Sequence, residues 1–153
     1  MKIVDGVNYT NWSRKQFENL KKANVNLVHV SVVYWEDTNE TFKVFEKWEK
    51  YFQENKDLII KIETVSDIKK AETEGKVGII LGWQNSAPIN SDLELLEYFF
   101  KQGLRVMQLT YNNQSYIGFE IYKLNKWNNN QLKHKLNRDQ LVHRNHCNLS
   151  RKI

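Results

Sequence analysis

Apolar runs and amphipathic stretches alternate along most of this chain. Residues 25–34 (VNLVHVSVVY) form a long β-branched run, which is typical of a strand that is buried on both faces. Residues 76–83 (KVGIILGW) and 104–110 (LRVMQLT) predict two more buried strands, and residues 2–5 predict a short one. Residues 58–60 fit either a short strand or a connection between two helices.

Helices are predicted between these runs. Three of them begin at a hydroxyl residue that is followed three positions later by a side chain able to bond back to the backbone: Ser13 with Gln16, Thr64 with Asp67, and Ser91 with Glu94. A fourth begins at Thr38 and carries an aromatic stripe. Gly75 and Gly103 suit the position that follows a helix end. The order β-α-β-α-α-β-α-β predicts a parallel sheet with right-handed crossovers, either open or an arc of a barrel.

Composition limits the class of protein. With 153 residues, 41% hydrophobic and 27% charged, the chain fits one globular domain. No apolar run approaches the roughly 18 residues of a membrane span, and the N-terminus lacks the features of a signal peptide. We therefore expect a cytoplasmic protein without a membrane partner. The single Cys147 excludes an internal disulfide and fits a reducing compartment.

The excess positive charge lies at the C-terminus. Eight Lys and Arg against two acids fall within residues 119–153, while residues 1–118 hold 15 basic and 16 acidic residues. The net charge of +5 therefore describes this segment and not a basic face of the folded part. Residues 119–153 also lack any periodic apolar pattern, so we expect an irregular basic tail there.

Polar and aromatic residues follow the ends of the predicted strands, where parallel α/β proteins place their chemistry. The candidate pocket residues are Asp5, Asn8, Tyr9, Gln84, Asn85, Tyr111 and Asn112. Amides and aromatic rings can orient a polar organic ligand by hydrogen bonds and stacking. The competing interpretation is that these residues form turns and helix caps. His29, inside a buried strand, is expected to be a core residue whose hydrogen bonds are satisfied.

A family resemblance rests on two blocks of sequence. Residues 75–118 resemble the third and fourth barrel strands of the membrane (renal) dipeptidase family, and residues 103–112 (GLRVMQLTYN) are similar to its "R-x-x-x-L-T-H-N" strand. Residues 4–6 (VDG) resemble the opening of its first strand, "D-G-H-N-D". The resemblance covers residues 2–118. It implies an α/β fold that makes up a partial TIM-type (β/α)8 barrel, roughly its first four β/α units.

The resemblance also implies a site with two zinc ions that hydrolyses dipeptides, but this chain departs from the family at the ligand positions. Val7 and Tyr9 stand where the first strand has His and Asp, and Gln84 stands where the third strand has a metal-bridging Glu. Tyr111 replaces a substrate-contacting His. Valine cannot bind zinc and a neutral amide is a poor bridge, so no metal ligand and no catalytic residue is assigned.

Other candidate ligands fit no better. Three carboxylates could supply oxygen atoms, but their spacing matches no motif, and we interpret them as structural or loop acids: Asp5, Glu36 and Asp37. The segment His143-x-x-His146-Cys147 lies in unpatterned sequence and lacks the four spaced ligands of a structural zinc site.

The sequence after residue 118 does not resemble the family. We interpret residues 1–118 as the N-terminal half of a dipeptidase-like barrel and residues 119–153 as a tail produced by a premature or frameshifted end. Four strands cannot close a barrel, so the last strand would expose an unpaired edge through which copies could associate.

Three functional hypotheses follow. The first is a zinc-dependent metallopeptidase that cleaves dipeptides, here truncated and inactive on its own, with a small peptide-like substrate. The second is a diverged, metal-free binding barrel for a small polar ligand. The third, a basic nucleic-acid binder, rests only on the tail, because no groove-reading helix or aromatic–basic pattern is present, and we expect no specific nucleic-acid partner.

Overall fold

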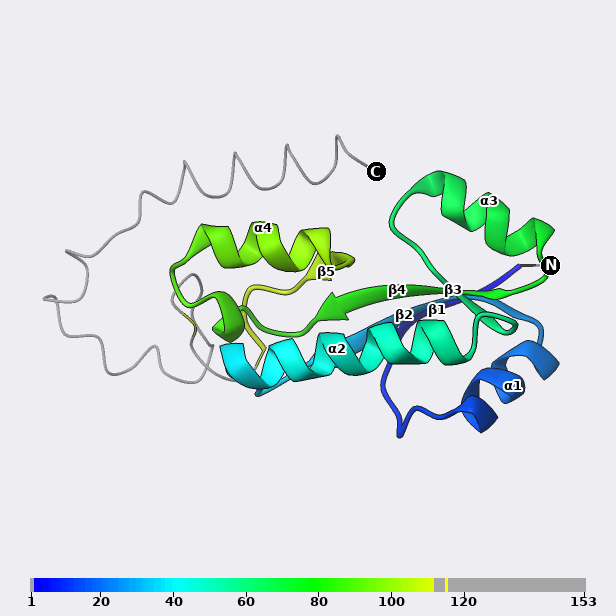
Figure 1. Ribbon diagram of the computed structural model, residues 1–153, viewed down its shortest axis with the longest axis horizontal. Helices are drawn as coiled ribbons and strands as arrows, with labels where there is room; N and C mark the ends of the chain where they lie inside the picture. Colours follow the sequence, from blue (N-terminus) through cyan, green and yellow to red (C-terminus); the bar gives the residue numbers. More distant parts are fainter. Residues whose placement is uncertain (1, 112–114, 116–153) are drawn as a thin grey trace, which may run out of the picture.

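A single sheet of five parallel strands organises the computed structural model, which describes residues 2–111 and 115 (Figure 1). The strands are β1 (Ile3–Asn8), β2 (Val25–Val33), β3 (Ile59–Lys61), β4 (Val77–Trp83) and β5 (Leu104–Met107). The helices are α1 (Arg14–Lys22), α2 (Thr38–Glu54), α3 (Val65–Thr73), the short 3₁₀ turn η1 (Ala87–Ile89) and α4 (Leu93–Lys101). Strands and helices alternate along the chain, as the sequence predicted.

The strand order identifies the sheet as an arc of a barrel. β1 pairs with β2, and β2 pairs with β4, in parallel. β3 and β5 both pair with β4: β3 lies along its first half, with Ile59 opposite Val77, and β5 along its second half, with Gly82 opposite Val106. The path of the arc is therefore β1-β2-β4-β5, which confirms the prediction of a partial TIM-type barrel. Of the undecided residues 58–60, Ile59 and Ile60 belong to strand β3, and Leu58 directly precedes it.

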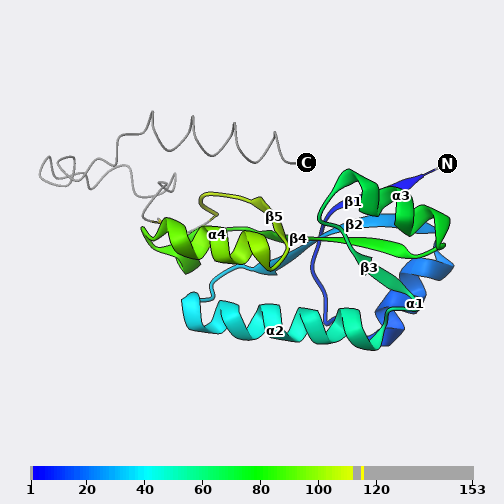
Figure 2. The same ribbon diagram turned by 45° about the horizontal axis from the view of Figure 1, so that its top comes forward.

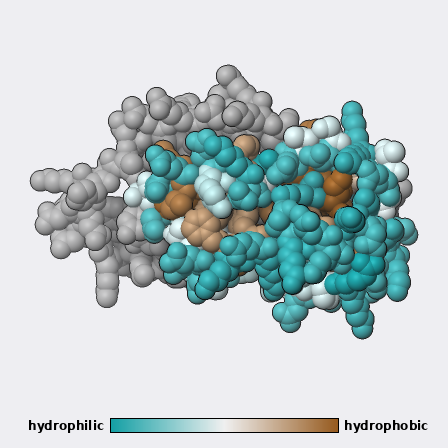
Figure 3. Space-filling view, viewed as in Figure 1, coloured by the Kyte–Doolittle hydropathy of each residue, from teal (hydrophilic) through white to brown (hydrophobic). Residues whose placement is uncertain are grey.

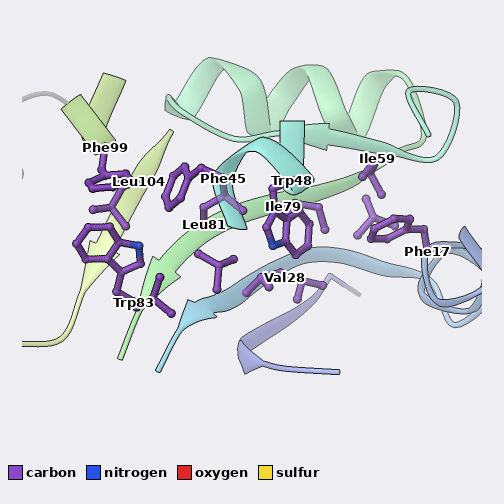
Figure 4. Packing of buried hydrophobic residues seen from close by; sticks show 14 of the residues in the cluster. Phe17, Val28, Phe45, Trp48, Ile59, Ile79, Leu81, Trp83, Phe99 and Leu104 are labelled. Carbon is purple, nitrogen blue, oxygen red and sulfur yellow. The ribbon is translucent and has the colours of Figure 1, made fainter. Parts of the chain in front are cut away.

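The hydrophobic core lies between the sheet and the helices that cover its outer face. α2 runs along one face of the sheet in both views of the ribbon and contacts β2 and β3 (Figures 1 and 2). Phe17 of α1, Trp48 of α2 and Phe99 of α4 point into this layer together with Trp83 of β4 (Figure 4). The rings of Trp83 and Phe99 meet edge to face, with centroids 5.0 Å apart. Full burial of a side chain such as Phe99 stabilises the fold by roughly 1.5–3 kcal/mol.

The outer surface of the helix layer is mostly hydrophilic (Figure 3). Hydrophobic atoms show in a strip between α2 and α4 (Figure 3). The rings of Phe42 on α2 and Tyr98 on α4 are in contact between these two helices, with centroids 5.3 Å apart. The outer face of the arc is thus closed by its own helices.

The predicted helix starts are partly right. Thr64 and Asp67 form a complete capping box at α3, in which each side chain is bonded to the other's backbone N–H. The predicted box of Ser91 with Glu94 is wrong, because Asp92 is the N-cap of α4 and its carboxylate accepts the Glu94 N–H at 2.8 Å. The carboxylate one residue later in the chain is the stronger acceptor for the first turn.

The two remaining starts also differ from prediction. α2 is capped by Asp37 and Glu40 and not by Thr38, whose hydroxyl donates to the Pro88 carbonyl at 2.6 Å. Ser13 is the N-cap of α1, but its side chain makes no capping hydrogen bond. Gly75 and Gly103 both take positive φ angles after helix ends, as predicted.

Helices in the described part of the chain are too short or too polar to cross a bilayer. The boundary at residue 118, the basic tail with its His143-x-x-His146-Cys147 segment, and Asn112 lie outside the described residues. Their predictions stay predictions.

Candidate functional site

The carboxyl ends of the parallel strands meet at one edge of the sheet, so the loops that follow β1, β2, β4 and β5 form a common rim. Backbone hydrogen bonds join neighbouring ends. The Gln84 N–H donates to the Val33 carbonyl at 2.9 Å, and the Gln108 N–H donates to the Trp83 carbonyl at 2.9 Å. Of the predicted pocket residues, Tyr9, Gln84, Asn85 and Tyr111 therefore come from adjacent loops of one edge, whereas Asp5 and Asn8 lie within β1.

Two aromatic pairs stand at this rim. The rings of Tyr9 and Tyr34 meet edge to face, with centroids 5.8 Å apart, and those of Trp35 and Tyr111 lie 6.2 Å apart. Tyr9 is 73% exposed, and Trp35 and Tyr111 are about half exposed. The predicted residues Tyr9 and Tyr111 are thus available to stack against a ligand.

Tyr34 is held more firmly than its aromatic neighbours. Its hydroxyl donates to the Ser31 carbonyl at 2.5 Å. Burial raises the pKa of the Tyr34 hydroxyl, and the charge of Glu36 raises it further. Tyr34 is therefore a neutral phenol that supports Tyr9 and does not act as a base.

The side chain of Asn85 makes structural hydrogen bonds. It is buried, its side-chain amide donates to the Tyr34 carbonyl, and its side-chain oxygen accepts the Ala87 N–H at 2.7 Å. These bonds fix the end of β2 against the turn before η1. The competing turn-former interpretation describes Asn85 better than a direct ligand contact does.

Gln84 differs from its neighbour. Its side chain is half-buried at the rim and makes no hydrogen bond to any other residue that the structure describes. Its amide can both donate and accept, so it is the best placed of the predicted polar groups to bind a ligand.

The acids near the rim are also occupied. The Asn8 amide donates to the Asp5 carboxylate at 2.6 Å, across an irregularity in the pairing of β1 with β2. The Glu36 carboxylate accepts the Tyr34 N–H at 2.6 Å and the Trp35 N–H at 2.9 Å. Asp37 caps α2. Each of these three carboxylates thus makes a structural hydrogen bond, while the place of Asp5 in a pocket stays a prediction.

Ser86 is a rim residue that sequence reasoning missed. It is fully buried, and its hydroxyl donates to the Leu109 carbonyl at 2.7 Å. This bond ties the loop after β4 to the segment after β5 and thereby places Tyr111. Its position next to Asn85 in a strand-end loop was the one signal in the sequence.

His29 lies on the inner face of the arc, which is turned away from the helices. Its Nδ1 is 2.6 Å from the Gly6 carbonyl oxygen, and because a carbonyl only accepts, Nδ1 carries the proton. Its ring covers Gly82, where an added Cβ would lie 2.0 Å from Nε2. Nε2 is buried without a partner among the described residues, as is the Ser31 hydroxyl. The expectation of a satisfied histidine is therefore right for one nitrogen and wrong for the other.

The donor set of the rim does not fit zinc. Among the described residues, no three His, Cys, Asp or Glu side chains come together as a metal site would require. The positions that the resemblance assigns to metal ligands hold Val7 and Tyr9, which are exposed, and the neutral Gln84. Hydrogen bonding and stacking remain as the chemistry of this rim.

Comparisons with known proteins agree with this geometry. A structure titled as an amidohydrolase from Pseudomonas aeruginosa is similar at 30% identity with a TM-score of 0.76, over 79% of this chain and 37% of that one. Dipeptidase AC, titled as a metallopeptidase of family M19, is similar in fold at 12% identity with a TM-score of 0.60, over 73% of this chain and 43% of that one. The chain thus spans less than half the length of these relatives.

Curated protein sequences give no match. The family model of membrane dipeptidase (peptidase family M19) matches residues 1–136, which is most of the chain and includes every strand described above. The chain belongs to the membrane dipeptidase family, peptidase family M19.

Proposed function

We propose that this chain supplies the first four barrel strands of a dipeptidase-type hydrolase, and that its rim binds a small peptide-like substrate without cleaving it. Family membership supports the hydrolase class. The observation that carries the binding role is the rim itself, where two aromatic pairs and Gln84, whose side chain has no hydrogen-bond partner among the described residues, follow the ends of neighbouring strands.

The chemistry of the rim suits a peptide group. A dipeptide presents one amide N–H and one amide carbonyl, and the side chain of Gln84 can pair with either. Tyr9 and Tyr111 offer exposed ring faces for the substrate side chains, while Asn85 and Ser86 hold the loops that carry Gln84 and Tyr111. These residues bind and orient a substrate, and none of them is placed to move a proton.

The same residues support the proposed inactivity of this chain on its own. Hydrolysis in the family, as the resemblance implies, uses zinc to activate water. Val7 and Gln84 cannot replace a histidine and a bridging carboxylate, and no other described acid is free at the rim. No catalytic step is therefore assigned to the described residues.

The alternative is a metal-free barrel that binds a small polar ligand other than a peptide. The replacement of ligand positions by Val7, Tyr9 and Gln84 favours it, because these residues preserve a pocket but not a metal site. Ligand preference separates the two functions: the first requires a dipeptide to bind better than other small polar molecules.

The test is calorimetric titration of the 153-residue chain with L-alanyl-L-alanine, with a zinc assay by atomic emission and a hydrolysis assay on the same sample. We expect dipeptide binding, zinc well below one equivalent and no hydrolysis. Gln84→Ala should weaken binding by about tenfold, the loss of one hydrogen bond of roughly 1.4 kcal/mol. Gln53→Ala, an exposed glutamine on α2, is the matched control and should bind normally.

Each other result decides between the hypotheses. Hydrolysis with zinc near two equivalents would contradict the assigned inactivity. Binding of polar molecules that are not peptides, with no response to the dipeptide, would favour the metal-free barrel. Equal effects of Gln84→Ala and Gln53→Ala would remove Gln84 from the site.

A further inference from the structure

The turn between η1 and α4 contains an asparagine in an unusual backbone conformation. Asn90 has a φ of 48° and a ψ of −107°, and among the described residues other than glycine only Asn24 shares its positive φ. The Asp92 N–H donates to the Ile89 carbonyl at 2.7 Å, so residues 89–92 form a β-turn with Asn90 and Ser91 at its centre. The angles of Asn90 are close to those of the first central residue of a type II′ turn, about +60° and −120°, a position that glycine usually occupies.

This conformation brings the side chain of Asn90 next to the backbone nitrogen of Ser91. In an L-residue, Cβ and N lie about 120° apart around the Cα–C bond, so at a ψ of about −120° Cβ eclipses the nitrogen of the next residue. Helix and strand residues, with ψ of about −42° and about +135°, keep that nitrogen away from the side chain. Asn90, with its ψ of −107°, therefore has the backbone geometry in which Cγ and the Ser91 nitrogen can close a succinimide ring.

The two reacting groups are accessible. Asn90 and Ser91 are both exposed, and the small side chain of Ser91 leaves its own nitrogen open to approach. The Ser91 N–H donates to no acceptor among the described residues. The side-chain amide of Asn90 has one contact within the described part of the chain, from Nδ2 to the Thr38 hydroxyl oxygen at 3.5 Å, which is long for a hydrogen bond. Neither group is thus held back from the other.

The chain contains the Asn-Ser pair a second time, in a different environment. Asn85 and Ser86 are both buried. The Asn85 amide donates to the Tyr34 carbonyl, and its side-chain oxygen accepts the Ala87 N–H at 2.7 Å. An attack by the Ser86 nitrogen would have to break these bonds, so the same pair of residues is protected there and free in the turn before α4.

We propose that Asn90 is a site of spontaneous deamidation through a succinimide. The Ser91 nitrogen forms a bond to Asn90 Cγ, the bond from Cγ to Nδ2 breaks, and the Ser91 amide proton leaves with Nδ2 as ammonia. Water then opens the ring at either carbonyl and gives an aspartate or an isoaspartate at position 90. Water is the one co-reactant, and no group is oxidised or reduced. The inference rests on the turn and not on the proposed function of the rim.

The test incubates the 153-residue chain at slightly alkaline pH and follows positions 85 and 90 by peptide mapping with mass spectrometry. We expect position 90 to react at least about tenfold faster than position 85, because only Asn90 is held near the attacking geometry. Isoaspartate should appear together with aspartate, since the ring opens at both carbonyls. A peptide of residues 82–93 contains both Asn-Ser pairs without the fold, and its two positions should react at similar rates. Asn90 in the folded chain should react at least as fast as in this peptide.

Two variants separate the amide from the attacking nitrogen. Asn90→Gly removes the amide and keeps a residue that accepts a positive φ, so the chain should fold normally and lose the reaction at position 90. Ser91→Val keeps Asn90 but crowds the nitrogen with a branched side chain, and should slow the reaction at least about fivefold. Circular dichroism checks that both variants are folded. Slower reaction of Asn90 in the folded chain than in the peptide, equal rates at positions 85 and 90 of the folded chain, aspartate without isoaspartate, or an undiminished rate in Ser91→Val would each overturn the proposal.

Discussion

The outer and inner faces of this sheet differ in how they are covered. On the outer face, helices from the same β/α units bury Phe17, Trp48, Trp83 and Phe99 almost completely. On the inner face, Val4 and Val106 are exposed. A βαβ unit covers its outer face with a neighbouring helix, whereas its inner face needs strands from across the barrel. In this arc, helices of the same chain cover the outer face of the sheet, whereas the inner face stays partly exposed among the described residues.

The largest expected effect is that of Phe99→Ala, on the outer face that the helices cover. The side chain is fully buried against Trp83 and Phe45, so its removal leaves a cavity and should lower the free energy of unfolding by about 3–5 kcal/mol. Tyr98→Ala, at the exposed neighbour on the same helix, should cost at most about 1 kcal/mol. Urea denaturation measures both. Equal losses would show that the helix layer is not the stable part of the fold.

Gly82→Ala tests the inner face. The new Cβ would lie 2.0 Å from His29 Nε2, so the ring must move and its bond to Gly6 is strained, at a cost of about 1–3 kcal/mol. The control is Gly6→Ala, where a Cβ meets nothing within 4 Å.

A double-mutant cycle identifies the cause of the Gly82→Ala effect. In a His29→Ala background the loss should largely disappear, because the clashing ring is gone. A loss of the same size in that background would mean that the inner face is crowded by something other than His29.

The smallest expected effect concerns the Asp67 carboxylate, which belongs to the capping box at the start of α3. Burial acts to raise its pKa, but hydrogen bonds from the Thr64 hydroxyl and the N–H groups of Glu63 and Thr64 outweigh burial and lower it from 3.8. A lowered pKa contributes stability that is present above the unfolded value, about 3.9, and is lost as pH falls through the folded value.

Asp67→Asn should therefore cost about 1 kcal/mol at pH 7 and progressively less below about pH 4. Thermal unfolding of both chains from pH 7 to pH 3 measures the difference. A gap that stays constant over this range would show that the ionised carboxylate is not what stabilises the helix start.

Much of the fold was predictable because its signals are local. The β-branched run that became β2 and the box of Thr64 with Asp67 act over a few residues, so the sequence pattern contains their physical cause. Prediction failed where two neighbouring residues could each act as the N-cap of the same helix. Ser91 and Asp92 can both cap α4, and the carboxylate prevails because a charged acceptor forms the stronger bond.

The site was only partly predictable. Tyr9, Gln84 and Tyr111 follow strand ends, and the rule that parallel strands end at one edge was enough to group them. That rule could not show that the Asn85 amide donates to the Tyr34 carbonyl while the Gln84 side chain has no hydrogen-bond partner among the described residues, because the two residues are adjacent and chemically alike.

The sequence by itself determined the alternation of strands and helices and the family, and it led to the prediction that Val7, Tyr9 and Gln84 stand at metal-ligand positions of the family. These features depend on the identity and spacing of residues along the chain. Only the tertiary structure decided that β3 and β5 share one edge of β4, that His29 bridges from Gly6 to Gly82, and that Val4 and Val106 are exposed among the described residues. The physical reason is that strand neighbours and burial are set by pairing between segments far apart in the chain.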